Sequence, residues 1–97
     1  MAVPLHLPTV LHGAAGARWE TLTLDVSDEG VRLARPPGPD PGSGELDVEI
    51  EVGDRVVCAQ ADVVRSTAYD IGLRFVAIDG DDRLLLTALT RAYERRL

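Results

Sequence analysis

Alternation between aliphatic and acidic residues from Leu46 to Val52 constrains the fold more than any other feature of the sequence. Four aliphatic residues alternate with three acids there, in the order Leu46-Asp47-Val48-Glu49-Ile50-Glu51-Val52. Successive side chains of a β-strand point to opposite faces of its sheet. The run therefore predicts a strand with one buried aliphatic face and one acidic face in contact with water.

Five other segments have a similar pattern and are separated by turn residues, so the sequence predicts six short strands. These segments are residues 3–12, 17–25, 31–33, 55–65 and 69–75. In the first of them Leu5, Leu7 and Leu11 share one face, but Pro4 and Pro8 lack the amide hydrogen that a strand ladder needs. We therefore expect the first segment to be an edge strand or a loosely paired one.

Local irregularities refine this prediction. The paired valines of residues 55–65 interrupt the alternation, which indicates a bulge or a bend. In residues 69–75 the alternation is regular and directs Ile71, Leu73 and Phe75 inward. Residues 36–44 are rich in proline and glycine, a composition typical of an exposed loop.

A helical pattern replaces the strand pattern near the carboxy end of the chain. Leu86, Leu89, Tyr93 and Leu97 recur at intervals of three or four residues, and the acidic run Asp79-Gly80-Asp81-Asp82 precedes them. Aspartates cap the amino ends of helices and interact favourably with the helix dipole there. We expect an amphipathic helix that continues to the chain end and packs its apolar stripe on an open end or face of the sheet.

Together these elements predict an all-β fold, namely a six-stranded antiparallel β-barrel or curled sheet with a C-terminal α-helix. The chain has 97 residues, which suits one domain covering residues 1–97. Aromatic residues make up only 4 % of the sequence, so we expect an aliphatic core. Cys58 is the single cysteine and lies in an apolar run, where it is expected to be a small buried hydrophobic residue.

Composition excludes several classes of function. The net charge of -6 argues against a DNA or RNA partner, because phosphate contacts require a basic surface. His6 and His12 have no third ligand at a metal-binding spacing, so no metal site is expected. No nucleophile–base pair or phosphate-cradling loop suggests an enzyme. The chain lacks a stretch long enough to span a membrane and begins without a signal-peptide pattern, so we expect a cytoplasmic protein.

Polar residues at fixed spacing join the second and third predicted strands, in the order Asp25-Val26-Ser27-Asp28-Glu29-Gly30. Asp25 and Ser27 occupy alternate positions, so in an extended backbone their side chains share one face. Two short polar side chains on one face can hold a small polar ligand. They can equally bond the amides of their own turn, as aspartate and serine often do.

The chain resembles the PilZ domain family, and the resemblance extends over nearly its full length. It rests on the Asp25–Gly30 run, which matches the family's D/N-x-S-x-x-G motif. Supporting matches are Gly44 before an alternating strand, Ala61-Asp62-Val63-Val64-Arg65, and Ile71-Gly72-Leu73-Arg74-Phe75 before the final helix. The resemblance implies a bacterial protein with a six-stranded barrel and a carboxy-terminal helix, of a kind that typically binds cyclic di-GMP.

By this resemblance, Asp25 and Ser27 would face the guanine and ribose-phosphate part of the ligand, and Gly30 would permit the turn. The expected ligand-binding residues are Asp25, Ser27, Gly30, Gly72 and Arg74. Gly72 is included because a strand glycine often marks the close approach of another group. Arg74, like Arg18, Arg32 and Arg35, is a cation that can substitute for arginines that the sequence lacks.

Those arginines belong to the family's R-x-x-x-R motif, which lies just before the first strand. Here no arginine or lysine precedes Arg18, and the predicted first strand already begins at Val3. Cyclic di-GMP carries two phosphates, for which arginine forks are well suited. Each charge-assisted hydrogen bond contributes roughly 1.5–3 kcal/mol, so losing two lowers the affinity on the order of a hundred- to ten-thousand-fold.

The sequence therefore supports two functional hypotheses. In the first, the chain is a non-catalytic, degenerate PilZ-like signalling module that acts through protein–protein contacts, with weak or no cyclic di-GMP binding and no other cofactor. Its candidate surfaces are the helix arginines Arg83, Arg91, Arg95 and Arg96 and the acidic face of Asp47, Glu49 and Glu51. In the second, it is a genuine cyclic di-GMP receptor whose arginines come from elsewhere, including a segment upstream of Met1.

Overall fold

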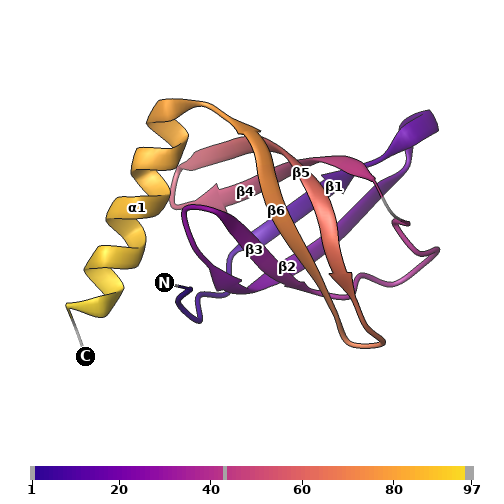
Figure 1. The fold of residues 1–97 in the computed structure, drawn as a ribbon, viewed down its shortest axis with the longest axis horizontal. Helices are drawn as coiled ribbons and strands as arrows, with labels where there is room; N and C mark the ends of the chain where they lie inside the picture. Colours follow the sequence, from indigo (N-terminus) through magenta and orange to yellow (C-terminus); the bar gives the residue numbers. More distant parts are fainter. Residues whose placement is uncertain (1, 43, 96–97) are drawn as a thin grey trace.

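Six antiparallel strands close into a barrel in the computed structural model, which describes residues 2–42 and 44–95 (Figure 1). The strands are β1 (Pro8–His12), β2 (Arg18–Val26), β3 (Gly30–Ala34), β4 (Glu45–Val52), β5 (Arg55–Ser66) and β6 (Asp70–Ile78). A short 3₁₀ turn, η1 (Ala14–Gly16), joins β1 to β2, and α1 (Gly80–Glu94) follows β6. Around the barrel the order is β1-β2-β3-β6-β5-β4, so the predicted all-β fold class is confirmed.

The prediction of an edge strand at the amino end is wrong, because β1 pairs with both β2 and β4. The prolines are accommodated because Pro4 lies outside the strand and Pro8 is its first residue. The strand is consequently shorter than residues 3–12. The segment before it instead runs beside β2, where Val3 and Val26 exchange backbone hydrogen bonds of 2.8 and 2.9 Å.

The core is aliphatic, as predicted, and the predicted inward faces are buried. Leu46, Val48 and Ile50 of β4 line it together with the inward residues of the other strands. The completely buried side chains are Leu11, Val26, Leu33, Ile50, Val57, Ala61 and Leu86 among the apolar residues, and Thr23 among the polar ones. The register between β5 and β6 shifts twice, which confirms the predicted bulge in residues 55–65.

Cys58 is exposed, so the prediction that it is buried is wrong. Its neighbours Val57 and Ala59 are buried, whereas Val56 and Gln60 are exposed. This part of β5 therefore alternates in the ordinary way, and its outer face carries apolar residues as well as polar ones. Because apolar residues occur on both faces of this part of β5, the alternation of buried and exposed side chains could not be recognised in the sequence.

The helix α1 begins as predicted, with Asp79 as its amino-terminal cap and the Asp79 Oδ1 atom accepting a 2.8 Å hydrogen bond from the Asp81 amide. Figure 1 shows α1 lying at one end of the barrel. Leu86 is completely buried in the barrel core, and Leu85 packs against it. Leu89 and Tyr93 of the predicted stripe are half-buried, and Leu97 lies outside the described residues. The expected docking of the helix is confirmed.

The proline-rich loop between β3 and β4 is mostly exposed, as predicted, but it is fastened at two points. Pro36 is buried. The Trp19 indole Nε1–H donates a 2.9 Å hydrogen bond to the Pro39 carbonyl oxygen. Ser43 of this segment lies outside the described residues. Within the described ranges, α1 is neither long nor apolar enough to cross a membrane.

Candidate functional site

Ser27 closes the turn between β2 and β3 with all the hydrogen-bonding groups of its side chain. Its Oγ accepts bonds from the amides of Glu29, at 3.1 Å, and Gly30, at 3.2 Å, and donates to the Gly30 carbonyl oxygen at 3.2 Å. The Ser27 amide donates to the same carbonyl at 2.9 Å. A serine hydroxyl offers one donor and two acceptor sites. All three are occupied by the turn.

Gly30 is required by the close approach of β6. A Cβ added at Gly30 would lie 2.1 Å from the Leu73 carbonyl oxygen and 3.1 Å from the Arg74 Cα. Its backbone is not in the left-handed region, because its φ does not fall between +20° and +160°. The glycine of the motif therefore allows β3 to pair closely with β6. The turn conformation, for which Gly30 was expected to be needed, does not require a glycine here.

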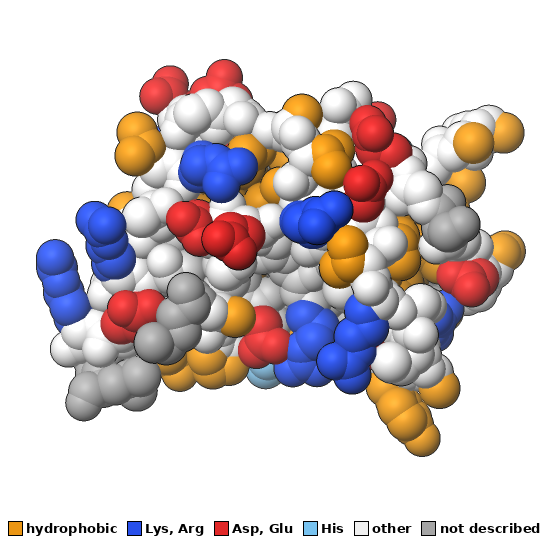
Figure 2. Space-filling model, in the orientation of Figure 1, with side chains coloured by type: hydrophobic (Ala, Val, Ile, Leu, Met, Phe, Trp, Pro, Cys, Tyr) orange, Lys and Arg blue, Asp and Glu red, His pale blue; other side chains and the backbone are white. Residues whose placement is uncertain are grey.

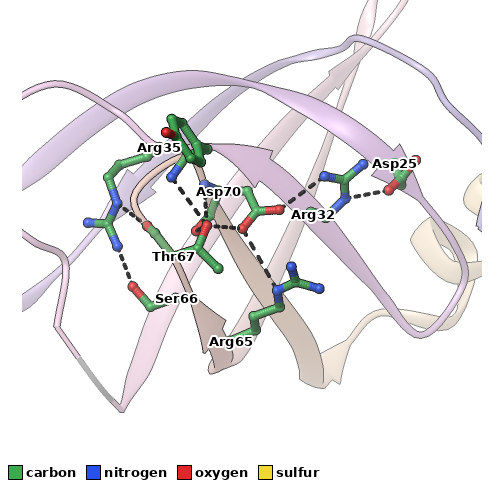
Figure 3. Close-up of polar contacts among 8 residues, drawn as sticks. Asp25, Arg32, Arg35, Arg65, Ser66, Thr67 and Asp70 are labelled. Atoms are coloured by element: carbon green, nitrogen blue, oxygen red, sulfur yellow. Dashed lines mark hydrogen bonds and ion pairs between the residues drawn. The ribbon is translucent and has the colours of Figure 1, made fainter.

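Asp25 contacts an arginine from the neighbouring strand. The Arg32 Nε donates to Asp25 Oδ2 at 2.5 Å, and the Arg32 Nη1 donates to Asp70 Oδ2 at 3.0 Å (Figure 3). These two hydrogen bonds, the one to Asp25 first, raise the pKa of the Arg32 guanidinium above its ordinary value. One arginine thus bridges two carboxylates that are far apart in the sequence.

Asp70 is the most buried member of this network, with 8 % of its side chain exposed. The Thr67 hydroxyl donates to Asp70 Oδ1 at 2.5 Å, and the Arg65 Nε lies 3.9 Å from the same oxygen. The Thr67 hydroxyl, followed by the Arg32 guanidinium, lowers the pKa of Asp70 below its usual range. Figure 3 shows these side chains converging from β3, from β5, from the turn between β5 and β6 and from the start of β6.

Strand register explains why these groups meet. Asp25 of β2 faces Arg32 of β3, Arg32 faces Gly72 of β6, and Gly72 faces Arg65 of β5. Arg74, two residues after Gly72, faces Gly30. The five predicted ligand-binding residues therefore lie on three adjacent strands or on the turn between two of them. Their role as a ligand site stays a prediction.

Three members of this network, Arg65, Thr67 and Asp70, were not predicted as site residues from the sequence. Their side chains reach Asp25 only through Arg32, and no local motif links them to the β2–β3 turn. Arg32 itself was named among the substitute cations. Arg35, also named, instead fastens the end of β3 to the β5–β6 turn, because its Nε donates to the Thr67 carbonyl at 2.6 Å. A broad hollow of about 820 Å³ lies elsewhere, lined in part by His12, Glu49, Cys58 and Asp79.

The low pKa of Asp70 predicts an acid-sensitive contribution to stability. Because folding lowers this pKa from 3.8, the contribution is complete above that pH and is lost as the pH falls through the folded value. We expect Asp70→Asn to flatten the fall in unfolding free energy below about pH 4. Urea titrations at a series of pH values measure this slope, and Thr67→Ala is expected to flatten it less. An unchanged slope in Asp70→Asn contradicts the assignment.

Comparisons with known proteins identify the family. A family model described as the PilZ domain matches residues 3–92. A search of curated proteins found no match. Among solved structures, the inhibitor of motility MotI/DgrA of Bacillus subtilis is similar, with a TM-score of 0.79 and 17 % identity over 98 % of this chain. This chain spans only 48 % of that protein.

Two further solved structures have the same fold. The PilZ domain of CeSA from a cellulose-synthesizing bacterium has a TM-score of 0.74 and 14 % identity, covering 97 % of this chain and 98 % of that one. An uncharacterized Legionella protein has a TM-score of 0.63 and 16 % identity, covering 99 % of this chain and 97 % of its own. At these identities the structural matches establish the fold alone. Because the family model spans almost the whole sequence, the chain belongs to the PilZ domain family.

Proposed function

We propose that this PilZ domain is a non-catalytic signalling module that acts through protein–protein contacts and binds cyclic di-GMP weakly or not at all. The observation that supports the proposal is that the polar groups of the family motif are already engaged within the chain. Ser27 closes its own turn, and Asp25 is hydrogen-bonded to Arg32. A nucleotide that approached these groups would have to displace those bonds.

The nearest cation does not serve as a free phosphate ligand. Arg32 contacts both Asp25 and Asp70, so turning toward a phosphate would leave Asp25 Oδ2 and Asp70 Oδ2 without their donor. A buried acceptor that loses its partner is costly, and Asp70 is almost completely buried. In addition, the sequence contains no arginine or lysine before Arg18. The network thus favours a structural role for the motif.

Under this proposal the protein contacts are made by exposed charged surfaces, and the module operates in the cytoplasm. One candidate surface consists of Arg83 and Arg91 of α1 with Arg95, which caps the helix end, and the other of the β4 acids Asp47, Glu49 and Glu51. Arg96, which belonged to the same expectation, lies outside the described residues. The β4 acids make no contact with the Asp25–Arg32–Asp70 network, whereas Arg83 of the α1 surface donates a 2.7 Å hydrogen bond to the Asp28 carbonyl oxygen in the motif turn.

A cyclic di-GMP receptor is the second candidate, and one observation favours it. The backbone pairing of Val3 with Val26 holds the segment before β1 directly beside Asp25 and Ser27. Arginines presented from that direction, by an upstream segment or by another protein, would reach the motif. In that case they would supply the phosphate contacts that Arg32 does not.

Calorimetric titration of the chain with cyclic di-GMP tests the proposal. We expect no measurable binding, or binding weaker than about 100 μM, because two arginine–phosphate contacts are lacking. The fold of the same sample is checked by circular dichroism. A dissociation constant of a few micromolar or tighter contradicts the proposal and supports the receptor.

A further inference from the structure

The face of α1 that points away from the barrel carries an exposed stripe of apolar and basic side chains. We call this the outer stripe of α1; its members are Leu84, Ala88, Arg91, Ala92 and Arg95, all exposed. Their spacing of three or four residues places them on one helix face, opposite the buried Leu86 and Thr90. Leu84 is 67 % exposed, which is unusual for a leucine beside a well-packed core.

Basic side chains are clearly visible along the outer edge of α1 in Figure 2. They stand out because the protein as a whole has a net charge of -6. Arg91 and Arg95 occupy the carboxy-terminal half of the outer stripe, whereas the acid on this face, Asp81, lies in the first turn. The basic character is therefore concentrated at one end of the helix.

A shallow hollow on the outer surface of β1, β2, β4 and β5 has the complementary character. We call it the acidic hollow; it has a volume of about 140 Å³ and is lined by Pro8, Thr9, Val10, Glu20, Thr21, Glu49, Glu51 and Val56. In the strand register, Val10 of β1 lies between Glu20 of β2 and Glu49 of β4. Three glutamates therefore surround an aliphatic floor.

The acidic hollow has apolar surface and carboxylates available to a partner. Val56, which lines it, is 48 % exposed, and so is Leu22, which faces Pro8 of the lining across the β1–β2 pair. Glu20 pairs with Arg18 at 3.1 Å and Glu49 with His12 at 2.5 Å, both on the surface. Glu51 forms no ion pair with any residue of the described ranges. Exposed ion pairs of this kind are weak and easily exchanged for other partners.

We propose that the outer stripe of α1 in one copy docks into the acidic hollow of a second copy. Leu84 and the two alanines match the aliphatic floor, and Arg91 and Arg95 match the glutamates. A cavity of about 150 Å³ holds a group the size of benzene, so the hollow has room for the leucine side chain. The complementary charges determine that the outer stripe of one copy meets the acidic hollow of the other. They contribute more to this specificity than to affinity.

The dimensions of the two surfaces agree. From Leu84 to Arg95 the helix rises about 16 Å, at 1.5 Å per residue. The acidic hollow crosses four adjacent strands, about 14 Å at the usual strand spacing. Because the net charge of -6 opposes association, the contact is expected to be reversible and to depend on these particular charges. This inference does not depend on whether cyclic di-GMP binds.

A charge exchange tests the contact. One variant, Glu20→Arg with Glu51→Arg, makes the acidic hollow basic, and the other, Arg91→Glu with Arg95→Glu, makes the outer stripe acidic. Sedimentation equilibrium at concentrations up to about 1 mM, in about 50 mM NaCl to limit screening, gives the mass of each sample. We expect the wild type to exceed its 10.4 kDa monomer mass as concentration rises.

Each variant alone is expected to associate at least about tenfold more weakly, because like charges then face each other. An equimolar mixture is expected to restore association, since each stripe again meets a hollow of opposite charge. Glu29→Arg with Asp54→Arg, which makes the same charge change at other exposed positions, is expected to associate at least as well as the wild type. Ala88→Glu places a charged side chain in the middle of the outer stripe and leaves Arg91 and Arg95 at the end of the helix unchanged. It is expected to weaken association.

Three results would overturn the proposal. They are a wild type that stays monomeric at the highest concentration, variants that associate as well as the wild type, and a mixture that stays monomeric although both variants are folded by circular dichroism. If the Arg91→Glu, Arg95→Glu pair unfolds the helix, Ala88→Glu decides the same question.

Discussion

Arginines placed at positions 2 and 6 are expected to raise the affinity for cyclic di-GMP by about a hundred- to ten-thousand-fold. Ala2 and His6 are both exposed, and the three residues between them give the R-x-x-x-R spacing that the family uses. Val3, between them, is bonded to Val26 and places position 2 beside the motif, and Leu7, next to position 6, is bonded to Thr23, two residues before Asp25. Each arginine adds a charge-assisted phosphate contact of roughly 1.5–3 kcal/mol.

Calorimetry on the wild type, on Ala2→Arg with His6→Arg, and on a matched control measures this gain. The control is Ala88→Arg with Ala92→Arg, which adds the same charge at the same spacing on the exposed face of α1. Any gain in the affinity of this control for cyclic di-GMP is expected to come only from its two added positive charges. If both arginine pairs give the same affinity, the gain does not depend on arginines beside the motif. The explanation of weak binding by two missing arginines is then wrong.

Gly30→Ala is expected to lower the free energy of unfolding by about 3 kcal/mol or more, at the upper end of the cost of overpacking. The added methyl group would lie 2.1 Å from the Leu73 carbonyl oxygen. That oxygen belongs to the backbone of a paired strand, so it cannot rotate away as a side chain can. β3 and β6 would have to separate, with loss of ladder hydrogen bonds.

Gly72→Ala is the matched control, since Gly72 lies on the strand adjacent to Gly30. A Cβ there would lie 3.2 Å from the Arg65 Cβ, 3.8 Å from the Val64 Cγ2 and 3.9 Å from the Arg65 backbone nitrogen, all much longer than the 2.1 Å contact at Gly30. We expect a change of less than about 1 kcal/mol, partly offset by the lower entropy of the unfolded chain. Urea denaturation compares the two. Equal stabilities for the two variants would show that the motif glycine does not shape the barrel.

Local pattern was sufficient to predict most of the strand faces. The alternation of Leu46–Val52 and of Ile71–Phe75 identified buried side chains correctly, because burial on one sheet face has a period of two. The helix start at Asp79 also followed from local capping chemistry. These features depend on residues that are neighbours in the sequence.

Features that depend on distant pairing were not predictable in this way. The pairing of β1 with β4 makes β1 an interior strand, and nothing near Pro8 indicates it. The contact between Arg32 and Asp70 joins positions 38 residues apart. The sequence identified Asp25 and Ser27 as possible ligand groups or turn-bonding groups, but only the register of β2 with β3 and of β3 with β6 shows that Asp25 shares Arg32 with Asp70.

The most direct test of the central claim is an NMR titration that follows the Arg32 Nε–H signal and the amides of Ser27–Gly30. The claim is that these groups are committed to the protein's own turn and ion-pair network. Adding cyclic di-GMP to a free concentration of about 10 μM, one tenth of the 100 μM limit expected for this chain, is expected to leave their positions essentially unchanged. Saturable shifts of the Arg32 and Ser27 signals with a dissociation constant of a few micromolar would contradict it.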